Sequence, residues 1–224
     1  MRHAMAASTV LALSLTVSPA VATVIGGTGG SDRLIGTSSA DIVRARGGDD
    51  VVDGRAGADR LYGDAGADTV RGGPGRDVGL GGPGRDVLGG GGSADLLFGD
   101  GARDHLVGGA GGDVLSGGPG DDLLLSGAGD DSLTDEIITE LSDAPGDDVL
   151  RGGAGADFFG VTGGQDRVLA GMGDDRVKTI DDGLRDLIDC GDGADQVTYY
   201  AVDGVGGLDP LDVLVGCERV TEAR

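Results

Sequence analysis

An aspartate recurs at every ninth residue through the first half of the chain, and no other feature of the sequence constrains the fold as strongly. The unbroken series is Asp32, Asp41, Asp50, Asp59, Asp68, Asp77, Asp86, Asp95, Asp104, Asp113, Asp122 and Asp131. An aliphatic residue follows two positions after each of these aspartates, except at Gly79. The consecutive nonapeptides GGPGRDVGL and GGPGRDVLG, residues 72–89, show the pattern at its most complete. Each block therefore predicts a tight glycine turn, then a very short strand with one inward-pointing side chain.

The period is interrupted twice toward the C-terminus. The later members of the series are Asp148, Asp157, Asp166, Asp175, Asp186 and Asp195. The first interruption is DEIITELS, residues 135–142, which stands where a nine-residue block would be expected. We favour a shortened block that keeps the stack in phase over a bulged loop. The second interruption adds two residues before Asp186.

Composition supports strands and turns over helices. The 224 residues include 49 glycines, and the net charge of −22 comes almost entirely from aspartate, since only four of the 39 acidic residues are glutamate. Glutamate favours helices, whereas aspartate and glycine favour turns. Composition alone would be typical of a disordered tail, but the strict period predicts an ordered chain. The acidic excess argues against nucleic acid or an anionic membrane surface as the partner.

Two blocks of this kind form one coil of eighteen residues. Stacked coils lie ~4.8 Å apart, so aspartates eighteen residues apart, such as Asp59 and Asp77, would lie directly above one another. Two ionised carboxylates at that distance repel by about 1 to 3.5 kcal/mol. A cation between them reverses the sign of this interaction. Carboxylate and backbone carbonyl oxygens in a flexible arrangement suit calcium better than magnesium, which requires a stricter octahedron.

The blocks GGPGRDVGL, GGPGRDVLG, GGAGGDVLS and GGPGDDLLL resemble the G-G-x-G-x-D-x-U-x nonapeptide of the RTX, or haemolysin-type, calcium-binding repeats. The resemblance extends from residue 27 to about residue 198. It implies an all-β fold, a right-handed parallel β-roll (a β-solenoid) with two nonapeptides per coil, and multiple Ca²⁺ ions held between the turns of blocks n and n+2.

The resemblance also implies a set of calcium ligands. The side-chain ligands would be the eighteen aspartates given above, from Asp32 to Asp195. The backbone of the turns would contribute at Gly72, Gly73, Gly75, Gly81, Gly82, Gly84, Gly108, Gly109, Gly111, Gly117, Gly118 and Gly120. The blocks GTSSADIVR, ARGGDDVVD and GDGARDHLV lack one or more of the turn glycines, so we expect their sites to be weaker or empty.

The two ends of the chain differ from the repeats. Arg2, the apolar run VLALSLTV and the small-x-small sequence Ala20-Val21-Ala22 predict a secretory signal peptide over residues 1–22. An uncleaved tether is the alternative, although the apolar run is too short for a stable membrane span. The mature chain is then expected to be extracellular, with the roll over residues 23–189 and the last repeat and a cap over 190–224.

Cys190 and Cys217 are the only cysteines. In an exported chain such a pair predicts a disulfide, whereas two free thiols remain the alternative if the chain is not exported. The segment from Cys190 to Cys217-Glu218-Arg219-Val220 resembles the end cap of small secreted relatives, which would seal the last coil.

The sequence does not predict an enzyme. His105 is the only histidine after the signal peptide, and it occupies an outward strand position. HExxH, GxSxG and P-loop patterns are absent. Paired acids such as Asp121-Asp122 could suggest a glycosidase, but they are ordinary turn positions of the repeat. We expect a structural or interaction role. The alternative is an adhesin-like module that binds a cell surface or polysaccharide through one face, for which no array of Thr, Asn or aromatic residues is found.

Overall fold

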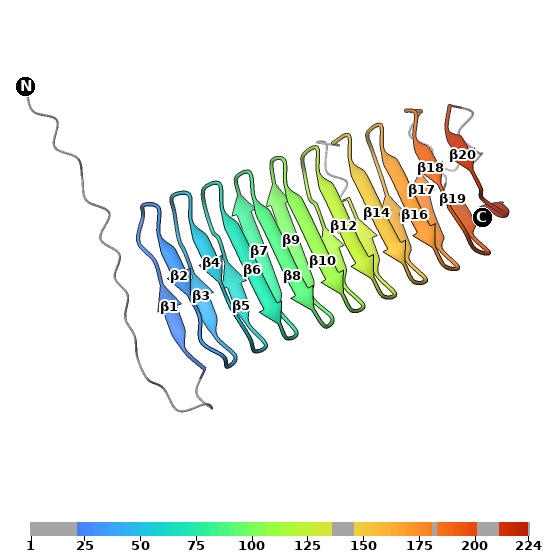
Figure 1. Cartoon of the computed structure of the whole chain (residues 1–224). Helices are drawn as coiled ribbons and strands as arrows, with labels where there is room; N and C mark the ends of the chain where they lie inside the picture. The colour runs from blue at the N-terminus through green and yellow to red at the C-terminus, as the bar shows by residue number, and fades with distance from the viewer. Residues whose placement is uncertain (1–21, 136–145, 181–182, 201–210, 224) are drawn as a thin grey trace, which may run out of the picture.

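Successive nonapeptides form successive strands, which alternate between two parallel sheets (Figure 1). The computed structural model describes residues 22–135, 146–180, 183–200 and 211–223, and these residues contain strands and turns but no helix. The predicted signal peptide therefore lies, apart from Ala22, outside the described residues. The chain is a parallel β-solenoid, as the repeat predicts.

The strands are three to six residues long and fall into two sheets of eleven and ten strands. The eleven-stranded sheet contains β1 (Val24–Gly26), β3 (Ile42–Arg44), β5 (Arg60–Tyr62), β7 (Val78–Pro83), β9 (Leu96–Gly101), β11 (Val114–Ser116), β13 (Ser132–Thr134), β15 (Phe158–Val161), β17 (Arg176–Ile180), β19 (Gln196–Tyr200) and β21 (Arg219–Glu222). The ten-stranded sheet contains β2 (Arg33–Ile35), β4 (Val51–Asp53), β6 (Thr69–Pro74), β8 (Val87–Gly92), β10 (His105–Ala110), β12 (Leu123–Ala128), β14 (Val149–Ala154), β16 (Arg167–Met172), β18 (Leu187–Asp189) and β20 (Val213–Val215).

The aliphatic column of the repeat forms the core between the two sheets. Each of its members from Val43 to Val197 is at most 2 % exposed, apart from the glycine at position 79. Gly79 leaves no methyl-sized space, because a Cβ added there would lie 3.1 Å from Leu97 Cδ2 and 3.6 Å from Leu88 Cδ2. Leu88 and Leu97 therefore fill the space in the core that a side chain at position 79 would otherwise occupy.

The expected shortened block at 135–142 is wrong. Residues 136–145 lie outside the described residues, but the pairing on both sides of them is clear. Leu124 pairs with Leu150 and Leu133 pairs with Phe159, a shift of 26 residues instead of 18. A further strand in the stack would have moved β14 to the other sheet, away from β12. The eight additional residues therefore add no strand to either sheet.

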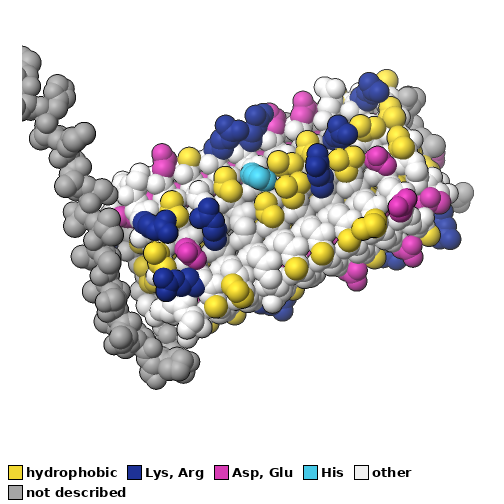
Figure 2. All heavy atoms as spheres, in the orientation of Figure 1, with side chains coloured by type: hydrophobic (Ala, Val, Ile, Leu, Met, Phe, Trp, Pro, Cys, Tyr) yellow, Lys and Arg dark blue, Asp and Glu magenta, His cyan; other side chains and the backbone are white. Residues whose placement is uncertain are grey.

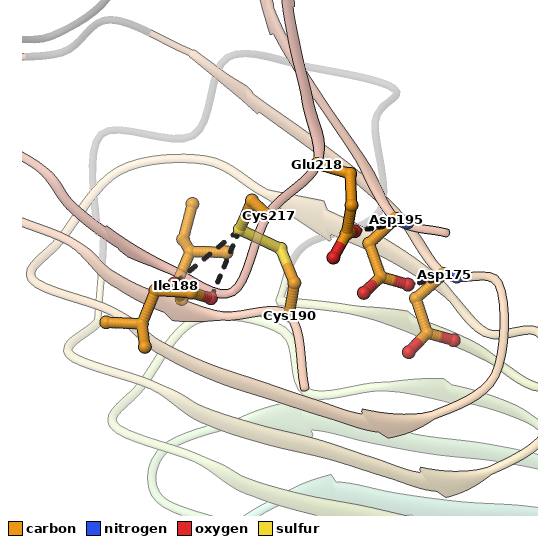
Figure 3. Close-up of a disulfide and its surroundings, with 7 residues drawn as sticks. Asp175, Ile188, Cys190, Asp195, Cys217 and Glu218 are labelled. Atoms are coloured by element: carbon orange, nitrogen blue, oxygen red, sulfur yellow. Dashed lines mark hydrogen bonds between the residues drawn. A yellow bond between two sulfur atoms is a disulfide. The ribbon is translucent and has the colours of Figure 1, made fainter. Parts of the chain in front are cut away.

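The C-terminal region continues the same sheets. Strands β20 and β21 pair in parallel with β18 and β19, so the described part of the cap consists of further strands of the solenoid. Cys190 and Cys217 form the predicted disulfide, with their Cα atoms 5.2 Å apart (Figure 3). The disulfide links the residue after β18 to the residue two before β21. It fastens the last coil to the coil before it.

Candidate calcium-binding site

The aspartates of the repeat form two hydrogen-bonded ladders, one along each edge of the solenoid. In each step the backbone N–H of one aspartate donates to Oδ1 of the aspartate in the next coil, with N···O distances from 2.6 to 2.9 Å. One ladder runs through Asp32, Asp50, Asp68, Asp86, Asp104, Asp122, Asp148, Asp166 and Asp186. The other runs through Asp41, Asp59, Asp77, Asp95, Asp113, Asp131, Asp157, Asp175 and Asp195. All eighteen predicted aspartates are thus members of the two ladders.

Three ladder members escape the sequence pattern. The N–H of Asp186 donates to Oδ1 of Asp212, and the N–H of Asp195 donates to Oε2 of Glu218 (Figure 3). At the other end, the N–H of Thr23 donates to Oδ1 of Asp41. Thr23, Asp212 and Glu218 each stand two residues before an apolar side chain, as the repeat requires. This shared spacing is the signal that could have identified them. Irregular intervals conceal Asp212 and Glu218, whereas Thr23 lies in register, nine residues before Asp32, and is missed because it is not an aspartate.

The second carboxylate oxygen of most ladder aspartates is buried and has no hydrogen-bond partner. This holds for Oδ2 of Asp50, Asp59, Asp68, Asp77, Asp86, Asp95, Asp104, Asp113, Asp122, Asp131, Asp157, Asp166, Asp175 and Asp195. A buried polar atom without a partner is costly, and an ionised one is more so. Acidic side chains are scattered over the face in Figure 2, but these ladder carboxylates are not among the exposed ones, because they are buried inside the turns. These unpaired oxygens point to a missing cationic partner.

Backbone carbonyl oxygens lie close to the unpaired carboxylate oxygens. A Cβ added to Gly72, the first residue of its block, would lie 2.3 Å from Asp77 Oδ2 and 2.8 Å from the carbonyl oxygen of Gly90 in the next coil. Gly81 and its neighbours repeat the arrangement, with Asp86 Oδ2 at 2.4 Å from the added atom. The same is found at the predicted Gly108 and Gly117, where Oδ2 of the block's own aspartate would lie at 2.5 and 2.4 Å. In these four blocks an added side chain would displace the carboxylate, whereas blocks such as those of Asp50 and Asp131 accommodate a buried Ala45 or Ser126 at the same position.

The second and fourth residues of the turn have left-handed backbone conformations. Among the predicted glycines, this applies to Gly73, Gly75, Gly82, Gly84, Gly109, Gly111, Gly118 and Gly120. At Gly75, with φ of 143°, an added Cβ would lie 1.7 Å from the carbonyl oxygen of Gly57 in the preceding coil. Several interior blocks that lack a glycine keep the conformation, since Arg46, Asp100 and Ala102 also have positive φ. Carbonyl oxygens therefore line both turn edges at regular intervals.

Burial raises the pKa of many interior ladder carboxyls. Desolvation is the largest cause of each increase, a hydrogen bond from the preceding coil opposes it, and neighbouring carboxylates add to it. The pKa values rise to about 6 for Asp59, Asp86 and Asp122, about 7 for Asp95 and Asp157, about 8 for Asp104 and Asp148, and about 9 for Asp166. Without a counterion, the folded chain therefore disfavours the ionised state of these groups near neutral pH.

The available donors fit calcium. Within the described residues, no three His, Cys, Asp or Glu side chains come together in a metal-binding arrangement, so carboxylates alone do not form a site. A site composed of one or two carboxylate oxygens and several backbone carbonyl oxygens remains possible, and such sets of hard oxygens with flexible geometry suit Ca²⁺. Zinc prefers sulfur and imidazole ligands, but the two cysteines are joined in a disulfide and His105 lies on a strand, so the described turns offer neither.

Comparison with known families agrees with this chemistry. The model of the RTX calcium-binding nonapeptide repeat (4 copies) matches residues 26–61, 48–79, 71–106, 98–133 and 143–177. The chain belongs to this RTX family. RTX nonapeptide repeats bind multiple Ca²⁺ ions, and calcium is accordingly the ion for which the two ladders of this RTX chain are suited. A search among curated proteins finds no match.

Calcium bound in the turns of this RTX protein would supply positive charge beside the unpaired Oδ2 atoms. The protein contributes the rigid spacing: Oδ1 is held by the backbone N–H of the preceding coil, and this bond directs Oδ2 toward the first glycine of the block. The assignment of individual aspartates and glycines as ligands stays a prediction. The structure brings all of the predicted residues to the turn edges.

Proposed function

We propose that the chain is a secreted calcium-binding protein that folds when it meets extracellular calcium. The single observation that supports this most strongly is the row of fourteen buried aspartate Oδ2 atoms without partners. Cytosolic free calcium is far below the affinity range of extracellular calcium modules, whereas extracellular calcium reaches it. The chain then remains unfolded during export and gains the free energy of calcium binding outside.

The proposed extracellular location has three supports. The sequence begins with a predicted signal peptide, and Cys190 and Cys217 form a disulfide, which persists in oxidising compartments. RTX repeat proteins are generally extracellular. Among the residues that the structure describes, no helix is long and apolar enough to cross a membrane.

We propose a structural or interaction role for the folded roll and no catalysis. The paired acids Asp121 and Asp122 illustrate the reason. Asp121 forms an exposed ion pair with Arg103, and its pKa is lowered chiefly by the hydrogen bond from that side chain. Asp122 is buried, and its Oδ1 accepts the N–H of Asp104. Neither carboxylate is placed as the free acid or base that hydrolysis would need.

Export and folding can be tested together. The full-length gene is expressed in a bacterial host, and the protein in the medium and periplasm is examined by intact mass and N-terminal sequencing. We expect a chain that begins at Thr23, carries an oxidised cysteine pair, and shows strand circular dichroism at ~2 mM calcium but not at ~1 μM. A chain retained in the cytoplasm with its N-terminus intact contradicts secretion. Equal strand signals at the two concentrations contradict folding on export.

A further inference from the structure

The first turn of each ladder differs from the turns that follow. In the first two blocks, Thr28 and Thr37 stand at the second turn position, where the blocks from Arg46 to Gly127 have glycine, arginine or aspartate. Thr162 occupies this position in a later block, but its N–H and hydroxyl donate to Asp135 and not to the aspartate of its own block. Neither threonine has a positive φ, and the same is true of Gly30 and Ser39 at the fourth position. From Arg46 onward, by contrast, the second position is left-handed in ten successive blocks. The backbone therefore changes conformation at the third block.

This change places protein donors on the carboxylate oxygen that is unpaired elsewhere. The backbone N–H of Thr37 donates to Asp41 Oδ2 at 2.6 Å, and the Thr37 hydroxyl donates to the same atom at 3.0 Å. In the neighbouring ladder, Thr28 makes the same two hydrogen bonds to Asp32 Oδ2, at 2.6 and 2.9 Å. Oδ2 of Asp41 thus has two partners, whereas Oδ2 of Asp59, in the next coil of the same ladder, has none.

The C-terminal end of the solenoid uses a similar arrangement. Tyr199, which is 2 % exposed, donates its hydroxyl proton to Asp212 Oδ2 at 2.8 Å. Oδ1 of Asp212 accepts the ladder hydrogen bond from Asp186. Here too a side-chain hydroxyl group binds the oxygen that remains unpaired in the interior of the ladder.

We infer that Thr28 and Thr37 replace calcium at the first turn of each ladder, so that Asp32 and Asp41 belong to a metal-free end coil and are not calcium ligands. This inference rests on the proposed calcium-binding function. A Ca²⁺ ion 2.3–2.6 Å from Asp41 Oδ2 would face the hydrogens of an N–H and a hydroxyl group that point at the same oxygen. Both hydrogens carry positive partial charge. The ion would therefore have to break two hydrogen bonds, one of which is charge-assisted and short.

The physical advantage of this arrangement concerns the end of the stack. An interior turn receives carbonyl oxygens from the coil on each side, whereas within the described residues the outermost turn has a neighbour on one side only. A metal there would lack part of its ligand set. Hydrogen bonds from within the same turn satisfy the carboxylate without that neighbour.

Counting bound calcium ions tests the inference. Purified full-length protein and the variants Asp41→Asn and Asp95→Asn are equilibrated with ~2 mM calcium, and bound calcium per chain is measured by equilibrium dialysis with elemental analysis. We expect Asp95→Asn to lose at least one ion and Asp41→Asn to lose none. Circular dichroism confirms that each variant is folded in calcium. A loss of calcium from Asp41→Asn equal to that from Asp95→Asn overturns the inference.

A second variant, designed to gain a calcium ion, tests the inference even if Asp41→Asn does not fold. The double variant Thr37→Gly/Ser39→Gly removes the hydroxyl donor from Asp41 Oδ2 and restores the glycine pattern with which the interior turns adopt the left-handed conformation that leaves Oδ2 without an N–H donor. We expect it to bind one calcium ion more than the wild type. An unchanged count in a folded double variant overturns the inference. If the wild type itself binds no calcium, the proposed function fails, and that outcome is separate from either result above.

Discussion

The backbone N–H of Asp77 donates a 2.8 Å hydrogen bond to Oδ1 of Asp95, eighteen residues later and one coil further along the solenoid. The bond fixes one oxygen of Asp95 and leaves the other, Oδ2, buried without a partner. The aspartate of each repeat thus joins adjacent coils through Oδ1 and leaves Oδ2 without the cationic partner that it needs. Because every coil repeats this arrangement, folding and calcium binding are coupled along the whole length of the roll.

Removing one interior ladder charge is expected to weaken calcium-dependent folding. Asp77→Asn keeps an acceptor for the N–H of Asp59 but replaces the unpaired Oδ2, or its equivalent, by an NH₂ group that repels calcium. We expect the calcium concentration at the folding midpoint, measured by circular dichroism, to rise several-fold.

Asp53→Asn serves as the matched control for this change. Asp53 lies on β4, outside both ladders, and is half-buried. Its substitution removes the same formal charge but leaves every ladder carboxylate unchanged. A midpoint that shifts equally in both variants would show that overall charge, and not the ladder, controls folding.

Acid is expected to replace calcium in part. The folded-state pKa values of Asp95, Asp104 and Asp166 are raised from 3.8 to about 7, 8 and 9. A carboxyl whose pKa is higher in the folded state contributes stability that is fully present below its unfolded pKa and is lost as pH rises through the folded pKa. In excess chelator, we therefore expect strand circular dichroism to increase as pH falls from 9 to 5. Saturating calcium should remove this dependence, and an apo strand signal that grows with rising pH would refute the account.

The turn glycines are expected to differ sharply in their tolerance of a methyl group. At Gly75 the backbone is left-handed and an added Cβ would lie 1.7 Å from a carbonyl oxygen, whereas at Gly89 nothing lies within 4 Å and φ is not positive. We expect Gly75→Ala to lower the free energy of unfolding in calcium by more than ~3 kcal/mol. Gly89→Ala should change it by less than ~0.5 kcal/mol, as measured by urea denaturation. Similar losses in the two variants would contradict the turn geometry.

Replacing Arg55 by glycine is expected to relieve backbone strain. The φ of Arg55 is 76°, a conformation that costs a non-glycine residue roughly 1–2 kcal/mol. Arg55→Gly should therefore stabilise the calcium-loaded roll by about 0.5–1 kcal/mol after the entropy of glycine is included. Arg76→Gly is the control, because Arg76 does not have a positive φ, and it should give no gain. Urea denaturation of both variants in calcium measures the difference.

Reduction of the disulfide is expected to loosen the last coil. The cysteines are 27 residues apart, and closing a loop of that length contributes ~3 kcal/mol in the chain-entropy model. We expect a reductant to lower the urea midpoint of the calcium-loaded protein. The variant Cys190→Ala/Cys217→Ala should start from the lower midpoint and show no response to reductant. A response in that variant would attribute the effect to something other than this bond.

Most of the fold is predictable from the sequence because one position dominates it. The constant interval between aspartates, such as Asp59 and Asp77, determines the coil length, the register and the sheet to which each strand belongs. The insertion after Asp135 could not be interpreted in this way, since eight residues resemble a nearly complete block in length. Only the pairing of Leu133 with Phe159 shows that they add no strand.

The last members of the two ladders could not be predicted from the sequence, for a different reason. Asp212 and Glu218 follow the previous members of their ladders by 26 and 23 residues, so no fixed period identifies them. The hydrogen bonds from Thr37 to Asp41 could not be predicted from the sequence either. They depend on a change in backbone conformation that redirects one N–H toward Asp41, and sequence spacing does not encode that direction.

The most direct test of the central claim is the calcium content of the ordered protein. Purified chain is folded in calcium at pH 8, passed through metal-free buffer, and analysed for strand circular dichroism and bound calcium before and after excess chelator. The account predicts several calcium ions per ordered chain and loss of the strand signal when chelator removes them. A chain that keeps its full strand signal at this pH with no bound calcium would contradict it.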